Sequence, residues 1–191
     1  MANQNIYEGE NFSKVTFTND QLNDKTFIKC HFYHCFFNEQ NLRECIFEDC
    51  NFEGCDLSLS KLNNCRFTDV EFKSSKLIGI DWTKSSKTFL EVGFENCNIS
   101  HSIFMGLNLK KTKIQACEAK DCDFTDTNLT ESSCNDTDFT ESIFSNTNLT
   151  SADLSHAKNY LIDPNFNIVK KAKFTFPEVM GLLSNLDIIV E

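Results

Sequence analysis

The chain has 191 residues with 28 acidic and 18 basic side chains, so its formal net charge is −10 at pH 7. This balance argues against direct binding to a nucleic-acid backbone, whose phosphates are neutralised by lysine and arginine, and it favours a basic protein partner. The sequence has no apolar leader-like segment at its start and no run of about 18 apolar residues. We therefore expect a cytoplasmic protein that is not embedded in a membrane.

A five-residue period runs along most of the chain. From Tyr7 to Trp82 every fifth residue is Phe, Leu, Tyr or Trp. The phase then slips by two residues near 83–88, and the period resumes at Phe89. Every fifth residue from there to 154 is again large and apolar, except for Ala119 and Cys134. Fifteen of the 19 Phe lie on this register, and a period of five fits neither a helix nor an ordinary strand.

The residue two places before each large one is small or modest, mostly Cys, Ser, Thr or Val. Because residues two apart on an extended backbone face the same side, each pentad points one large and one small side chain inward and turns a corner with the others. A period of 20 groups like residues into columns: Leu22, Leu42, Leu62 and Trp82; Tyr7, Phe27, Phe47, Phe67 and Phe89; Phe12, Phe32, Phe52, Phe72 and Phe94; and, below Trp82, Phe104, Phe124 and Phe144. Four pentads per coil predict an all-β solenoid, a four-sided β-helix of about seven coils.

The ten Cys raise the alternative of a disulfide framework or a zinc site. Nine occupy the small inward position and Cys134 occupies a large one, so we expect free thiols buried in the core. No Cys-x-x-Cys pair is present, and His31 and His34 fall on turn positions where exposure is the default. We expect no metal, no cofactor and no catalytic residues, and therefore a protein that is not an enzyme.

The pentads stop near the C-terminus, which divides the chain into a repeat domain, residues 1–158, and a C-terminal segment, residues 159–191. Pro177 suits the first turn of a short helix, and apolar residues follow it at helical spacing. We expect this helix to cover the open end of the coils and, with the residues after it, to pair with a second copy in an isologous homodimer. The expected cap and dimer residues are Val179, Leu182, Leu183, Leu186, Ile188, Ile189 and Val190.

Acidic residues gather toward the end of the repeat, since residues 121–154 contain eight acids and no Lys or Arg. Positions one coil apart should place Glu118 beside Asp138 and Asp121 beside Glu141. We call these four residues the acidic patch and expect it to bind a partner, because like charges stacked across strands are otherwise mildly destabilising. The alternative is that the acids only keep the rod soluble.

Pentads such as Thr127-Asn128-Leu129-Thr130-Glu131 resemble the repeat of the pentapeptide-repeat family, over about residues 7–157. The resemblance implies a right-handed quadrilateral β-helix. The tail is similar to the tails of the microcin B17 immunity protein and of Qnr-type quinolone-resistance proteins, through Asp163-Pro164, Pro177-Glu178-Val179-Met180-Gly181-Leu182-Leu183 and Leu186-Asp187-Ile188-Ile189-Val190.

Those relatives act on DNA gyrase and topoisomerase IV, and they are read as acidic rods that resemble a DNA duplex and pair through their C-termini. The resemblance therefore implies a non-enzymatic DNA mimic that binds DNA gyrase or topoisomerase IV and protects it from quinolones or a peptide toxin. Qnr proteins of Gram-negative bacteria carry long loops that matter for protection, whereas the interruption here is the short slip. The alternative is a scaffold or protein-interaction module without a topoisomerase role, because a fold does not determine a function.

Overall fold

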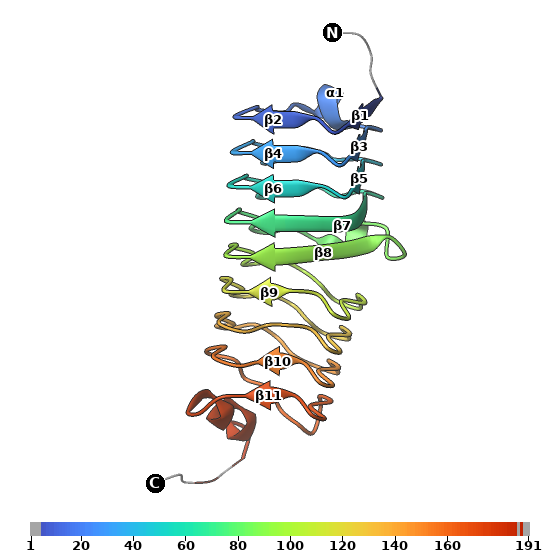
Figure 1. Cartoon of the computed structure of the whole chain (residues 1–191). Coiled ribbons are helices and arrows are strands. Elements are labelled where there is room, and N and C mark those ends of the chain that lie inside the picture. Colours follow the sequence, from blue (N-terminus) through green and yellow to red (C-terminus); the bar gives the residue numbers. More distant parts are fainter. Residues whose placement is uncertain (1–4, 187, 189–191) are drawn as a thin grey trace.

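The computed structural model describes residues 5–186 and 188. The chain winds into a right-handed, four-sided β-helix whose coils stack along one axis, with the N-terminal and C-terminal parts at opposite ends of the rod (Figure 1). This confirms the fold class expected from the pentads. About eight coils are stacked, rather than about seven, because the winding continues beyond residue 158. No helix in the described ranges is long and apolar enough to cross a membrane.

All strand pairs are parallel, and each strand pairs with its counterpart one coil away. Two faces of the first coils carry β1 (Ile6–Glu8), β3 (Thr26–Ile28) and β5 (Ile46–Glu48), and β2 (Asn11–Ser13), β4 (His31–Tyr33) and β6 (Asn51–Glu53). The later strands are β7 (Arg66–Lys73), β8 (Leu90–Glu95), β9 (Ile114–Gln115), β10 (Asp153–Leu154) and β11 (Lys173–Phe174). The helical segments are α1 (Asn19–Leu22) and the 3-10 helices η1 (Trp82–Lys84) and η2 (Glu178–Leu183).

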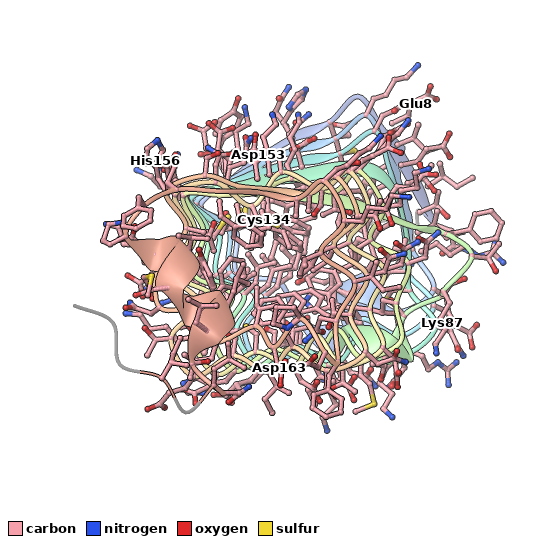
Figure 2. All side chains as sticks on the ribbon, turned by 90° about the horizontal axis from the view of Figure 1, so that it is seen from below. Glu8, Lys87, Cys134, Asp153, His156 and Asp163 are labelled. Atoms are coloured by element: carbon pink, nitrogen blue, oxygen red, sulfur yellow. The ribbon has the colours of Figure 1, made fainter. Side chains whose placement is uncertain are left out.

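Stacked aromatic rings fill the centre of the rod, as the period of 20 predicts. Ring centroids in one column lie 4.5–5.6 Å apart in nearly parallel pairs, through Phe12, Phe32, Phe52, Phe72 and Phe94. Another column continues from Trp82 to Phe104 and Phe124, where the last two centroids are 5.1 Å apart. A view along the axis shows side chains occupying the interior (Figure 2). Each fully buried Phe contributes on the order of 1.5–3 kcal/mol.

In the described part of the chain, the corners are made by residues in the left-handed backbone region, of which only four are glycine and none is proline. Among residues 5–186 and 188, twenty-five non-glycine residues have φ between 47° and 64°, mostly one in every pentad, two places after the large inward residue. Aspartate, asparagine, lysine, glutamate, histidine and serine all occupy this position. A single residue in this region is strained unless the surrounding structure holds it. Here the stacked coils hold it, which explains how a chain with only 6 Gly and 2 Pro turns so often.

The small inward side chains hydrogen-bond along the axis. The hydroxyl of Thr147 donates to the carbonyl of Phe124 (2.9 Å). In the same way, the thiol of Cys50 donates to the carbonyl of Phe27 (3.3 Å). The same bond, from a small residue to the large residue 23 positions earlier, recurs along the rod. All ten Cys are free and buried, as expected. Burial raises the pKa of the Cys50 and Cys122 thiols to about 12, so they stay protonated and can donate.

The slip after Trp82 is present, but the pentad register assigned the wrong residue to the core there. Phe67 pairs with Leu90, not with Phe89, and Phe89 is 44% exposed. The reason is that β8 is a straight strand, in which Leu90, Val92 and Phe94 point inward with a period of two. Phe89 instead points outward under Arg66, whose guanidinium carbon lies 4.9 Å from the ring centroid.

Coil geometry continues past the last clear pentad. β10 pairs with β11 in register, Leu154 opposite Phe174, and the amide of Asn167 donates to the carbonyl of Phe144 as a small inward residue would. The boundary expected at residue 158 therefore marks the end of the pentad pattern, whereas parallel pairing extends to Phe174. The short helix η2 follows at the lower end of the rod (Figure 1).

We expect Thr147→Val to destabilise the rod by about 0.5–1.5 kcal/mol, because valine keeps the shape but removes the axial hydrogen bond to the buried Phe124 carbonyl, which then keeps only the bond from the Thr127 N–H. Urea unfolding followed by circular dichroism measures this change. The matched control is Thr130→Val, at a half-exposed outward position, which should change stability by less than about 0.5 kcal/mol. Equal effects of the two substitutions would contradict the role given to the inward hydroxyls.

Candidate partner-binding surface

The coil geometry brings the acidic patch together as two stacked pairs. Glu118 and Asp138 are partners in an isolated parallel bridge, one coil apart. Asp121 and Glu141 occupy left-handed corners one coil apart, with φ of 52° and 60°, and the backbone N–H of Asp121 donates to the carbonyl of Thr140 (2.9 Å). The period of 20 therefore predicted the neighbours in this patch correctly.

A lysine lies between the two carboxylates of the first pair. The Nζ atom of Lys120 is 3.9 Å from Glu118 and 3.5 Å from Asp138. Asn159 also donates to Asp138 (2.8 Å), and Asn98 donates to Glu118 (3.0 Å). The repulsion expected between stacked carboxylates is thus largely relieved within the chain, and this half of the patch is less negative than its sequence suggests.

Asp138 has a second role as a turn-forming residue. Its carboxylate accepts hydrogen bonds from the backbone N–H and the hydroxyl of Thr140, at 3.1 and 2.6 Å. Desolvation on its own raises the pKa of Asp138, but the bonds from Thr140 and Asn159 outweigh it, so the pKa lies below its usual value. Asp138 therefore stabilises the fold, whereas Glu118, Asp121 and Glu141 project from the rod as exposed side chains.

Lysines from neighbouring coils neutralise other acids in the same region. Glu131 lies 3.3 Å from Lys110 and 3.7 Å from Lys111, and the hydrogen bond from Lys110 lowers the pKa of Glu131. Asp153 lies 3.2 Å from Lys173, one coil below. His101 lies 3.5 Å from Asp121. The acid-rich stretch of sequence is therefore not a uniformly negative surface.

The structure places the expected cap and dimer residues at the lower end. Val179, Leu182 and Leu183 lie in η2 and are half-buried, and Leu182 packs against the core. Gly181 lies against the backbone carbonyl of Tyr160, where a Cβ atom would collide. Leu186 and Ile188 follow η2 and are exposed. Ile189 and Val190 lie outside the described residues.

Further apolar side chains at this end were not identified from the sequence. They are exposed and come from the last coil and the segment before η2: Leu161, Phe166, Ile168 and Phe176. Phe176 is 81% exposed. Since these residues follow the last clear pentad, the period gave no indication of which side they face.

The described residues contain no group of three or more His, Cys, Asp or Glu side chains placed to hold a metal ion. Two open hollows lie at the surface, one at the slip and one at the last coil. What the rod offers chemically is therefore an outer surface of charged and apolar side chains over a closed core.

A four-sided parallel β-helix with one inward pair and one left-handed corner in each pentad defines a pentapeptide-repeat solenoid. The chain belongs to the pentapeptide-repeat family: the family model described as a pentapeptide repeat region matches residues 25–88, and the model described as pentapeptide repeats (8 copies) matches residues 122–158. Together these segments make up more than half of the chain. No curated protein matches this sequence.

Solved structures of QnrB1, described as a plasmid-mediated fluoroquinolone resistance protein, have the same fold. Two trypsin-treated variants superpose with TM-scores of 0.64 and 0.62, at 18% and 17% sequence identity. The match covers 97% of this chain in both cases, and 98% and 97% of the respective QnrB1 chains. At this level of identity the likeness shows the fold.

The lowered pKa of Asp138 predicts a pH-dependent contribution to stability. A carboxyl group whose pKa is lower in the folded chain than the unfolded value of about 3.9 stabilises the fold above that value and loses this effect as the pH falls through the lowered pKa. Asp138→Asn should therefore be less stable than the unchanged chain at pH 7, with the difference shrinking toward pH 3. Urea midpoints at pH 7, 5 and 3 test this.

Thr140→Val is the matched comparison for this prediction. It removes one donor to Asp138 and keeps Asn159 and Lys120, so its pH-dependent loss should be smaller than that of Asp138→Asn. A difference between Asp138→Asn and the unchanged chain that stays constant with pH would show that the carboxylate charge plays no part.

Proposed function

We propose that this protein is a non-enzymatic, acidic binding protein that occupies the DNA-binding surface of a type II topoisomerase, DNA gyrase or topoisomerase IV. The observation that carries the proposal is the charge repeated along the corners of a straight rod. Ten of the 25 left-handed non-glycine corners are Asp or Glu and four are Lys. Coils rise by about 4.8 Å, so acids on stacked corners, such as Asp121 and Glu141, repeat at a fixed rise along the rod, as phosphates do along DNA.

The overall charge of −10 supports attraction to a groove that normally holds a polyanion. The fold shared with QnrB1, a fluoroquinolone resistance protein by its description, supports the same partner class. On this proposal the protein acts in the cytoplasm, where these enzymes meet DNA, and needs no cofactor. Its effect would be protection from a quinolone or from a peptide toxin.

The experiment is a supercoiling assay with purified gyrase, with and without a fluoroquinolone, together with direct binding by surface plasmon resonance. The patch variant combines Glu118→Lys, Asp121→Lys and Glu141→Lys. This variant leaves Asp138 unchanged. The fold tolerates lysine at all three positions: the column of Glu118 already contains Lys76 and Lys158, and Asp121 and Glu141 occupy left-handed corners of the kind that Lys111 occupies. We expect binding to weaken at least about tenfold, or ~1.4 kcal/mol.

The control variant makes the same change in net charge at the other end of the rod, through Glu8→Lys, Glu10→Lys and Glu48→Lys, all at exposed positions. It should retain binding within about threefold, since charge beyond a Debye length of about 8 Å is largely screened. An unchanged chain that neither binds gyrase nor alters supercoiling or drug-induced cleavage would remove the proposal.

The ion pairs of the acidic patch favour a second candidate, a scaffold or interaction module without a topoisomerase role. Lys120 neutralises the Glu118–Asp138 pair internally, so these two acids need no partner to relieve their repulsion. This candidate predicts that gyrase activity is unaffected by the protein and by both variants.

We also propose that two copies pair through the lower end in an isologous homodimer. The support is the set of exposed apolar side chains there, of which Phe166 and Phe176 are 69% and 81% exposed. Exposed apolar side chains gathered at the end of the coil stack are available for an interface, and a two-fold axis would bring the same side chains of both copies together.

Light scattering on a sizing column should give the mass of two chains, and Phe176→Asp with Leu186→Asp should give one chain with an unchanged fold. Phe89→Asp, at an exposed aromatic residue far from this end, serves as the control and should stay dimeric. A mass of one chain for the unchanged protein would contradict the dimer.

A further inference from the structure

The slip in the repeat leaves a charged cleft on the side of the rod. It has a volume of about 390 Å³ and opens at the corner where β7 and β8 pass from one face to the next. Binding sites for ligands commonly have volumes of about 300–1,000 Å³. The cleft lies outside the acidic patch and the lower end, so it is a separate surface of the molecule.

The cleft exists because the pentad pattern is broken at this corner. Instead of a left-handed corner residue, β8 runs straight through Val92 and Gly93. Gly93 has no side chain, and the carboxylate of Glu71 from the coil above lies where its Cβ would be. The loop that follows η1 holds the two extra residues of the slip, forms a side of the cleft and carries Lys87 to the outer edge of the rod (Figure 2).

An ion pair crosses the floor of the cleft. The carboxylate of Glu71 reaches over Gly93 to Lys113, whose Nζ lies 3.5 Å away. These two residues belong to coils on either side of the one that contains Gly93, since Glu71 pairs with Gly93 and Lys113 directly precedes β9. The pair is internally neutral, so the floor carries no net charge.

The two rims carry opposite charges. Asp69 and Glu91 line the cleft from β7 and β8, and within the described residues neither has a cation within 4.0 Å. Lys110 and Lys111 line the opposite rim and share the single carboxylate of Glu131, which leaves one positive charge uncompensated. Lys87 adds a second positive charge from the loop.

An aromatic side chain borders the cleft. Phe89 lies between the lining residues Thr88 and Leu90, points outward and is 44% exposed under the guanidinium of Arg66. Exposed aromatic residues and arginine are the side chains that most often dominate the energy of a protein interface. An apolar contact is thus available beside the part of the cleft that Thr88 and Leu90 line.

We propose that this cleft binds a polypeptide segment that carries a basic and an acidic side chain a few residues apart, with an apolar side chain beside them. The basic group would face Asp69 and Glu91, the acidic group would face Lys110 and Lys111, and the apolar group would cover Phe89. A nucleic acid fits less well, because two uncompensated carboxylates in the cleft repel phosphates. This site goes beyond the proposed binding of a topoisomerase and does not depend on it.

The test selects random 12-residue peptides displayed on phage against the immobilised full-length protein. The matched variant swaps the rims through Asp69→Lys and Lys111→Asp, which preserves composition and net charge. Both positions are left-handed corners, with φ of 51° and 64°, and such corners hold Asp and Lys elsewhere in the chain. Peptides enriched on the unchanged protein should combine both charges with an apolar residue and bind the swapped variant at least about tenfold more weakly, or ~1.4 kcal/mol.

Two further variants, Phe89→Ala and Lys87→Ala, each remove one outward side chain next to the core. Each should weaken the binding of the same peptides by at least about threefold. Thermal melting followed by circular dichroism confirms that every variant is folded. The proposal is overturned if the enriched peptides carry only one sign of charge, if they bind the swapped variant equally well, or if oligo(dT) displaces them from the cleft. Gyrase is absent from this experiment, so its outcome is independent of the topoisomerase proposal.

Discussion

The rod depends on hydrogen bonds that run parallel to its axis. A chain that turns every five residues cannot form long strands, and most pentads below β8 pair only through isolated bridges. The carbonyl of a large inward residue accepts one hydrogen bond from the backbone N–H three residues on, as Phe104 does from Leu107, and it needs a second donor for its other buried lone pair. A thiol, hydroxyl or amide from the next coil supplies that donor, as Thr127 does for Phe104. This requirement explains why the small inward position holds Cys, Ser and Thr far more often than Ala.

The same requirement decides what the sequence could predict. The columns of Phe and Leu could be predicted from the period alone. A large apolar residue must be buried at every fifth position, and only one register of the sequence provides such residues throughout. The pairing of Glu118 with Asp138 followed from the period of 20. The exposure of Phe89 could not be predicted from the period. Phe89 and Leu90 are both large and apolar, and Leu90 enters the core only because β8 runs straight. Lys120 between Glu118 and Asp138 was missed for a related reason: spacing places side chains on a face but does not say which way a flexible lysine reaches.

Charge on this surface has to be assigned by coil rather than by segment. Residues far apart in the sequence become neighbours at each turn, so an acidic stretch and a lysine-containing stretch can neutralise each other, as Glu131 and Lys110 do. At the slip the rule is interrupted, and a pair from non-adjacent coils, Glu71 and Lys113, meets over Gly93. The rod therefore presents regions of distinct chemistry, an acidic patch, an apolar end and a cleft with two signs, on one uniform core.

The left-handed corners have a consequence for how such chains diverge. The same backbone geometry holds Asp121, Lys111, His156, Ala116 and Leu59. A corner therefore accepts many different residues without disturbing the winding, although none of the 25 described is β-branched, and the outer edges can change while the inward residues stay constrained by packing. The fold shared with QnrB1 at 17% identity requires no likeness at these outer positions. Within this fold, the interior carries the constraints of the winding, and the corners are free to carry chemistry suited to a particular partner.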